Sequence, residues 1–76
     1  MKTSEIKKEA RKLLNTIFYK AMESDDKEVW KKTLAFIDCK ITQLENWDRG
    51  QDMFIWRNAK QQFVFEFWKK FINASK

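Results

Sequence analysis

Histidine and proline are absent from the 76-residue sequence, and cysteine and glycine each occur once, as Cys39 and Gly50. Without histidine the chain has no imidazole for acid–base catalysis, for activating a serine or cysteine, or for binding a metal. One cysteine excludes an internal disulfide and a cysteine-based zinc site. One glycine excludes the P-loop and the dinucleotide fingerprint, because both need several glycines where the backbone approaches phosphate.

Paired carboxylates are the remaining candidates for chemistry, Asp25 with Asp26 and Asp48 with Asp52. Both pairs stand where helices are expected to begin, and a carboxylate there caps free N–H groups and interacts favourably with the helix dipole. Cys39 has no neighbouring base and is expected to be a half-buried structural thiol. We therefore expect no enzyme, no metal site, no cofactor and no small-molecule substrate.

Long hydrophobic runs are also missing. The longest strictly apolar run covers residues 53–56, whereas a membrane span needs about 18 apolar residues and a signal peptide about 7–15. We expect a soluble cytoplasmic protein without membrane association, with Cys39 reduced.

The residues that are present favour helices. Lys, Glu, Leu, Gln and Ala suit helix interiors, and the turn residues of β-hairpins are missing. Polar breaks at residues 23–26 and 46–50 divide the chain, with Asp25 and Glu28 resembling a capping box. The sequence predicts one all-α domain over residues 1–76, an antiparallel three-helix bundle with helices at about 4–22, 26–45 and 49–73.

Apolar residues follow helical spacing in the first two segments. The stripe of the first helix comprises Ile6, Ala10, Leu13, Ile17 and Ala21, widened by Leu14 and Phe18. The narrow seam of the second helix comprises Trp30, Leu34, Ile37, Ile41 and Leu44. Charge alternates basic, acidic, basic along the three segments, which favours an acidic middle helix packed between two basic ones.

The third segment is rich in aromatic residues, which are Phe54, Trp56, Phe63, Phe65, Phe67, Trp68 and Phe71. At about 100° per residue, one face of this helix is expected to form the core. That face comprises Met53, Trp56, Phe63, Val64, Phe67, Trp68 and Phe71. Phe54, Phe65 and Ile72 cluster on its flank and widen the apolar arc to about 200°.

Two explanations account for this wide arc. In the first, the helix is central and its flank is covered by Trp47, by the first helix or by a second copy of the chain. In the second, Phe54, Trp56, Phe65 and Ile72 form an exposed docking patch, since aromatic side chains supply large rigid contact area.

Two cations, Arg57 and Lys60, fall inside the apolar arc. Their stems either lie along apolar surface with the charge in water, or the two side chains form the polar part of a site for an acidic partner or phosphate. A second basic group lies on the first helix, opposite its apolar stripe, and comprises Lys7, Lys8, Arg11 and Lys12. This ridge is either a solvated helix face or a surface that follows a phosphate backbone.

A small, non-catalytic, aromatic-rich helical chain is typical of an adaptor, a subunit or an inhibitor, and small inhibitors encoded by phages or mobile elements often have this size. We therefore expect a module that binds a protein partner, or itself as a homodimer, through the aromatic flank of the third helix. The alternative is a nucleic-acid-binding accessory protein that uses the ridge of the first helix.

Overall fold

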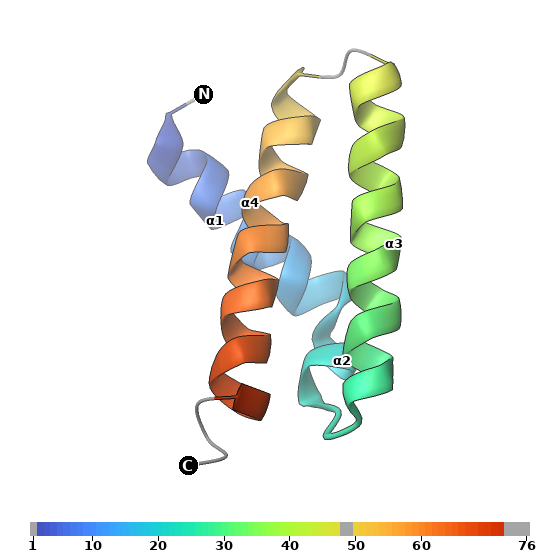
Figure 1. The fold of residues 1–76 in the computed structure, drawn as a ribbon. Helices are drawn as coiled ribbons and strands as arrows, with labels where there is room; N and C mark the ends of the chain where they lie inside the picture. The colour runs from blue at the N-terminus through green and yellow to red at the C-terminus, as the bar shows by residue number, and fades with distance from the viewer. Residues whose placement is uncertain (1, 48–49, 73–76) are drawn as a thin grey trace.

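The computed structural model describes residues 2–47 and 50–72, and in these ranges it contains helices and turns but no strand. Figure 1 shows the elements in chain order: α1 (Thr3–Ile17), α2 (Tyr19–Glu23), α3 (Lys27–Asn46), α4 (Gly50–Phe67) and a π-helical turn, η1 (Trp68–Ile72). The all-α prediction is confirmed for the described residues.

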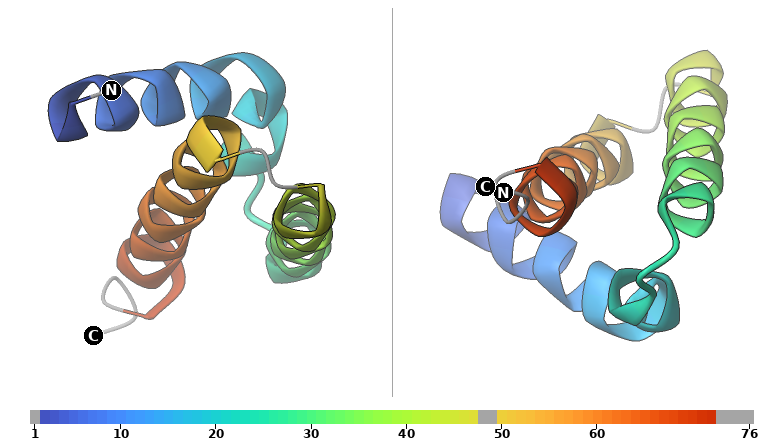
Figure 2. Two further views of the ribbon diagram at one scale, coloured as in Figure 1. Left: turned by 90° about the horizontal axis from the view of Figure 1, so that it is seen from above. Right: turned by 60° about the horizontal axis from the view of Figure 1, so that its bottom comes forward.

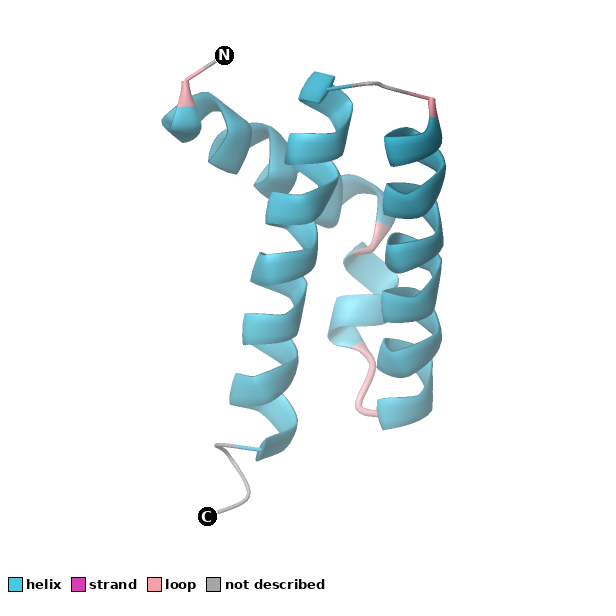
Figure 3. Ribbon diagram, turned by 45° about the horizontal axis from the view of Figure 1, so that its top comes forward, coloured by secondary structure: helices cyan, strands magenta, loops and turns pink. Residues whose placement is uncertain are grey.

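The first predicted helix, residues 4–22, is interrupted at Phe18. This residue has φ −106° and ψ 14°, and it separates α1 from α2, as Figure 3 shows. Its ring is buried and packs edge-on against Phe36 and Trp56, with centroid distances of 6.1 Å and 5.8 Å. Within the expected stripe, Ile17 is exposed, whereas Ala10, Leu14 and Phe18 are buried as predicted.

Helix α3 lies within one residue of its predicted bounds and buries its predicted seam. Trp30, Ile37, Ile41 and Leu44 are buried, and Leu34 packs against the core. The N-cap is Asp26 rather than Asp25, since the Asp26 carboxylate accepts a hydrogen bond from the Glu28 N–H at 2.9 Å.

Helix α4 begins at Gly50 and passes into the π-helical turn at Trp68. The predicted ends of this helix at residues 49 and 73, and the cap at Asp48, lie outside the described residues. The core stripe predicted for it is partly wrong, because Val64 and Trp68 are exposed while Ala59 is fully buried.

The helices form two layers, with α3 and α4 side by side and antiparallel in front of α1 and α2 (Figures 1 and 2). Helix α1 crosses behind α4 obliquely. Helix α4 contacts both α1 and α3, so α4 rather than the acidic α3 is the central helix. Ala10 and Ala59 are fully buried within one turn of the hydrogen bond between the Gln62 side chain and the Lys7 carbonyl, and their small side chains permit close approach of α1 and α4.

Candidate functional site

The side of α4 and η1 that α1 and α3 leave uncovered carries a stripe of exposed apolar side chains. Phe54, Phe65, Trp68 and Ile72 are 50%, 59%, 45% and 49% exposed. Neither Trp47, itself 69% exposed, nor α1 covers them. We call this surface the outer face; its residues are Phe54, Arg57, Gln61, Val64, Phe65, Trp68 and Ile72.

An apolar hollow of about 380 Å³ lies between α3 and α4, beside the outer face. Trp30, Lys31 and Leu34 line it from α3. The residues that line it from α4 and η1 are Phe63, Val64, Phe67, Trp68 and Ile72. We call it the α3–α4 hollow; its size is that of a pocket for a small ligand or for side chains of a partner.

A second hollow of about 580 Å³ lies on the outer face itself. Its lining residues are Arg57, Lys60, Gln61, Val64, Phe65 and Trp68. Because Val64 and Trp68 line both hollows, the two hollows adjoin along these side chains. We call the second one the outer hollow.

Arg57 and Lys60 connect α4 to α3 through ion pairs. Arg57 Nη2 lies 2.5 Å from Glu45 Oε1, and Lys60 Nζ lies 2.6 Å from Asp38 Oδ1. These ion pairs explain why two cations stand within an apolar arc. Both side chains also keep about half of their surface exposed. The same two cations line the outer hollow, so they serve the fold and remain accessible to a partner.

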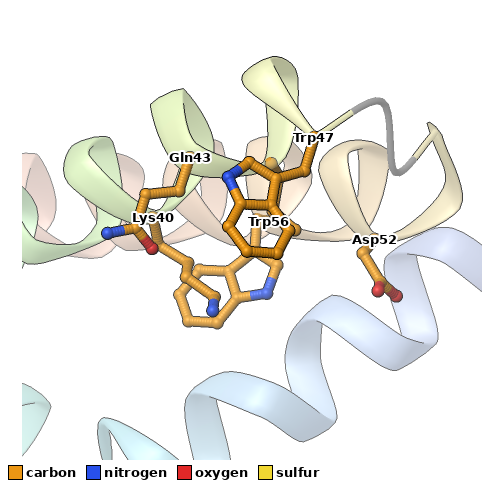
Figure 4. Close-up of a pocket in the computed structure, with 6 residues that line it drawn as sticks. Lys40, Gln43, Trp47, Asp52 and Trp56 are labelled. Carbon is orange, nitrogen blue, oxygen red and sulfur yellow. The ribbon is translucent and has the colours of Figure 1, made fainter.

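Trp56 lies apart from the other predicted docking residues. It packs against the core and lines a separate hollow of about 310 Å³ at the α3–α4 connection. Figure 4 shows the side chains of Trp47 and Trp56 in this hollow, with Lys40 and Gln43 on one side and Asp52 on the other. The structure therefore separates Trp56 from Phe65 and Ile72.

The sequence did not identify Val64 and Trp68 as surface residues, because both fall on the apolar stripe expected to be core. The available signal was on the opposite side of the helix, where Ile55 and Ala59 mark the surface that packs against the core. Since Ala59 is a weak hydrophobic marker beside seven aromatic residues, the predicted core face extended too far toward Val64 and Trp68, although Phe63 is buried as predicted.

All four residues of the basic ridge on α1 are exposed, and they are Lys7, Lys8, Arg11 and Lys12. Arg11 turns toward α4, where its Nη2 lies 3.7 Å from Glu66 Oε1. The Lys7 carbonyl accepts a hydrogen bond from the Gln62 side chain at 3.3 Å. Half of the ridge thus borders α4, and Lys8 and Lys12 lie on the solvent side.

The polar groups considered for chemistry lie apart. Cys39 is exposed rather than half-buried, because it lies off the buried seam of α3. Asp25 Oδ1 lies 3.2 Å from Lys70 Nζ, and Asp48 is outside the described residues.

Within residues 2–47 and 50–72, no three His, Cys, Asp or Glu side chains are grouped to hold a metal ion. In the same ranges, no helix is sufficiently long and apolar to cross a membrane.

The outer face and the two hollows are the candidate site that this geometry supports. They hold five of the six predicted docking residues, which are Phe54, Arg57, Lys60, Phe65 and Ile72. Phe54 lies on the same side of the helix, because it is 11 residues from Phe65 and 18 from Ile72.

Compared with family models, curated proteins and solved structures, the chain matches none of them.

Proposed function

We propose that the chain is a non-catalytic helical module that binds a protein partner, as an adaptor or inhibitor in the cytoplasm, through the outer face of its aromatic-rich C-terminal helix. The observation that carries this proposal is the uncovered stripe of Phe65, Trp68 and Ile72 beside two adjoining hollows. Contiguous exposed apolar surface in a soluble protein marks interaction sites.

The chemistry of the outer face supports binding of a protein. An aromatic side chain offers about 150–250 Å² of surface, so half exposure of several neighbours leaves a patch typical of an interface. Trp and Arg, which dominate binding energy in interfaces, both line the outer hollow as Trp68 and Arg57. The α3–α4 hollow supplies the concave surface in which a partner side chain is fully desolvated.

A capture experiment with matched variants tests the proposal. The tagged chain, Phe65→Ala and Phe36→Ala are each used to retain proteins from the native lysate after nuclease treatment. Phe65 and Phe36 have nearly equal exposure, 59% and 57%, but Phe36 lies on α3 away from the outer face. We expect a defined partner that the wild type and Phe36→Ala retain and Phe65→Ala loses. Equal retention by all three chains would contradict the proposal.

The alternative function, nucleic-acid binding, rests on the exposed ridge of Lys7, Lys8, Arg11 and Lys12. Neutralising phosphates releases counterions, so affinity for nucleic acid falls steeply as salt rises. If nuclease removes all retained material, and if Lys8→Gln with Lys12→Gln weakens binding to a DNA duplex and reduces its salt dependence, the ridge is the functional surface.

A further inference from the structure

The hollow of about 310 Å³ beside Trp56 lies where α3 leads into α4. We call it the connection hollow; its lining residues are Lys40, Gln43, Leu44, Trp47, Asp52 and Trp56. Unlike the α3–α4 hollow, it combines two indole rings with an ammonium, an amide and a carboxylate. Small-molecule pockets measure about 300–1,000 Å³, so the connection hollow suits a ligand with one ring system.

The two tryptophans of the connection hollow provide aromatic surface from two elements. Trp56 of α4 is fixed, because it packs against the core and lies edge-on to Phe18 at a centroid distance of 5.8 Å. Trp47, the C-cap residue of α3, is 69% exposed. Within the described ranges it has no ring contact with another aromatic side chain. Figure 4 shows both indoles at the hollow, so a flat ring can stack on Trp47 without breaking a contact between aromatic rings.

The polar side chains of the connection hollow are free to bind a ligand. Among the described residues, no ion pair and no side-chain hydrogen bond engages Lys40, Gln43 or Asp52. By contrast, the cations of the outer hollow are each paired with a carboxylate of α3. Lys40 is half-buried, and a half-buried ammonium without a carboxylate partner favours an anionic ligand.

The charged groups stand on opposite sides of the indoles. Lys40 and Gln43 lie on one side and Asp52 on the other (Figure 4). A complementary ligand therefore has an anionic group at one end, a flat ring in the middle and N–H donors at the other end. The Gln43 amide can both donate and accept hydrogen bonds next to the anionic end. A nucleotide combines these features, with a phosphate, sugar hydroxyls and an aromatic base.

We propose that the connection hollow binds a nucleotide whose base carries an exocyclic amine, as adenine, guanine and cytosine do, either free or within a single strand of nucleic acid. The base stacks on the indoles of Trp47 and Trp56. The phosphate pairs with Lys40, and the amine donates to the Asp52 carboxylate. This site is separate from the outer face, so the inference goes beyond the protein binding proposed above and does not depend on it.

A quaternary ammonium group is the other ligand that tryptophan side chains recognise. The free ammonium of Lys40 repels such a cation, whereas it attracts a phosphate. The charge of the connection hollow therefore favours the nucleotide, and tetramethylammonium is the probe that compares the two ligands directly.

The test follows the indole N–H signals of the four tryptophans by NMR while the full chain is titrated with small ligands. The probes are AMP, UMP, adenosine, ribose 5-phosphate and tetramethylammonium. We expect AMP to shift the signals of Trp47 and Trp56 and to leave those of Trp30 and Trp68 unchanged. UMP, which lacks the amine, and adenosine, which lacks the phosphate, should each bind at least about threefold more weakly.

Matched variants assign each contact. Trp47→Ala is expected to weaken AMP about tenfold, and Trp47→Phe less, because phenylalanine keeps an aromatic face. Lys40→Gln should weaken AMP about threefold and remove its salt dependence, with no effect on adenosine. Asp52→Ala should bring AMP and UMP within about twofold of each other. Lys32→Gln, at an exposed position of the same helix as Lys40, is the control and should leave AMP binding within about twofold.

An oligodeoxyadenosine of about eight nucleotides distinguishes the two sources of the base. Binding at least about tenfold tighter than AMP, through the same two indoles and with stronger salt dependence, would identify a single strand. Equal affinity would identify the free nucleotide.

Several results would overturn the nucleotide site. These are unchanged signals of Trp47 and Trp56 with both AMP and the oligonucleotide, equal shifts with ribose 5-phosphate, or tighter binding of tetramethylammonium. Equal losses in Lys40→Gln and Lys32→Gln would overturn the role of Lys40. Capture of a protein partner through Phe65 is unaffected by these results, because the outer face does not include Trp47 or Trp56.

Discussion

Trp30 stabilises the core near the α2–α3 connection through both its ring and its N–H group. The ring is 1% exposed and lies 4.8 Å from the centroid of Phe63 and 5.6 Å from that of Phe71. Its Nε1 donates a hydrogen bond of 2.7 Å to the Ser24 carbonyl, which fixes the connection between α2 and α3. One side chain thus links α3, α4 and the turn that precedes α3.

Replacing Trp30 by Phe is expected to lower the free energy of unfolding by about 2 kcal/mol. The variant keeps an aromatic ring but loses the donor to Ser24 and leaves space beside Phe63. Urea denaturation followed by circular dichroism measures the change. Trp47→Phe is the matched control, because Trp47 is exposed and its replacement should cost less than about 0.5 kcal/mol. Equal effects of the two substitutions would contradict this assignment of Trp30.

Tyr19, the single tyrosine of the chain, forms a pair with Glu23 in α2. A hydrogen bond from the Tyr19 hydroxyl to the Glu23 carboxylate, and the negative charge of Glu23, raise the pKa of Tyr19 above its ordinary value of 10.0. The folded chain holds this proton more tightly than the unfolded chain does. The interaction therefore favours the folded state at pH values below the ordinary pKa, and this contribution is lost as pH rises through the raised pKa. Absorbance titration should give a midpoint above 10.0, and Glu23→Gln should lower it; an unchanged midpoint in that variant would exclude the pair.

Helix α2 has only five residues and depends on contacts from other elements. Lys70 of η1 provides them, since its Nζ donates to the carbonyl oxygens of Met22 and Glu23 at 3.4 Å and 3.3 Å. A cation at a helix C-terminus satisfies free carbonyls and interacts favourably with the helix dipole. The π-helical turn therefore secures the end of α2.

We predict that Lys70→Met lowers the free energy of unfolding by about 1 kcal/mol. Methionine keeps an unbranched side chain at this position but cannot donate to the α2 carbonyls or pair with Asp25. Lys69→Met is the matched control at the neighbouring, exposed position. Hydrogen exchange of the α2 amides provides a local readout, which should accelerate in Lys70→Met and stay unchanged in Lys69→Met. If α2 exchanges equally in both variants, Lys70 does not secure it.

At the scale of elements, the sequence predicted best where a helix has one narrow apolar stripe. The seam of α3 has a single narrow stripe, and Trp30, Ile37 and Ile41 are buried as predicted. The break at Phe18 was not predictable, because no Gly, Pro or polar cluster marks it; its cause is tertiary, the packing of Phe18 against residues of α3 and α4. In α4 the excess of apolar residues concealed which side is core, so Trp68 was assigned to the wrong surface.

At the scale of the whole molecule, a two-layer chain of this length leaves one side of its central helix uncovered. Helix α1 packs against one side of α4, and α3 packs against another. Small domains bury a smaller fraction of their surface than large ones, and here the uncovered side of α4 and η1 includes the large apolar side chains of Phe54, Phe65 and Trp68. Exposed apolar side chains of this size lower solubility, which is the physical argument behind the proposal that a partner covers the outer face.

This argument predicts that the outer face contributes little to stability. Phe65→Ala is expected to change the free energy of unfolding by less than about 1 kcal/mol, whereas Phe63→Ala, at a site 1% exposed two residues earlier on α4, should cost about 3–5 kcal/mol. A domain of this size has about 4–11 kcal/mol in total, so Phe63→Ala removes much of it. Urea denaturation measures the free energy of unfolding of both variants, which carry the same Phe→Ala substitution at two positions of the same helix. If Phe65→Ala were as destabilising as Phe63→Ala, Phe65 would be a packing residue, and the docking function of the outer face would be wrong.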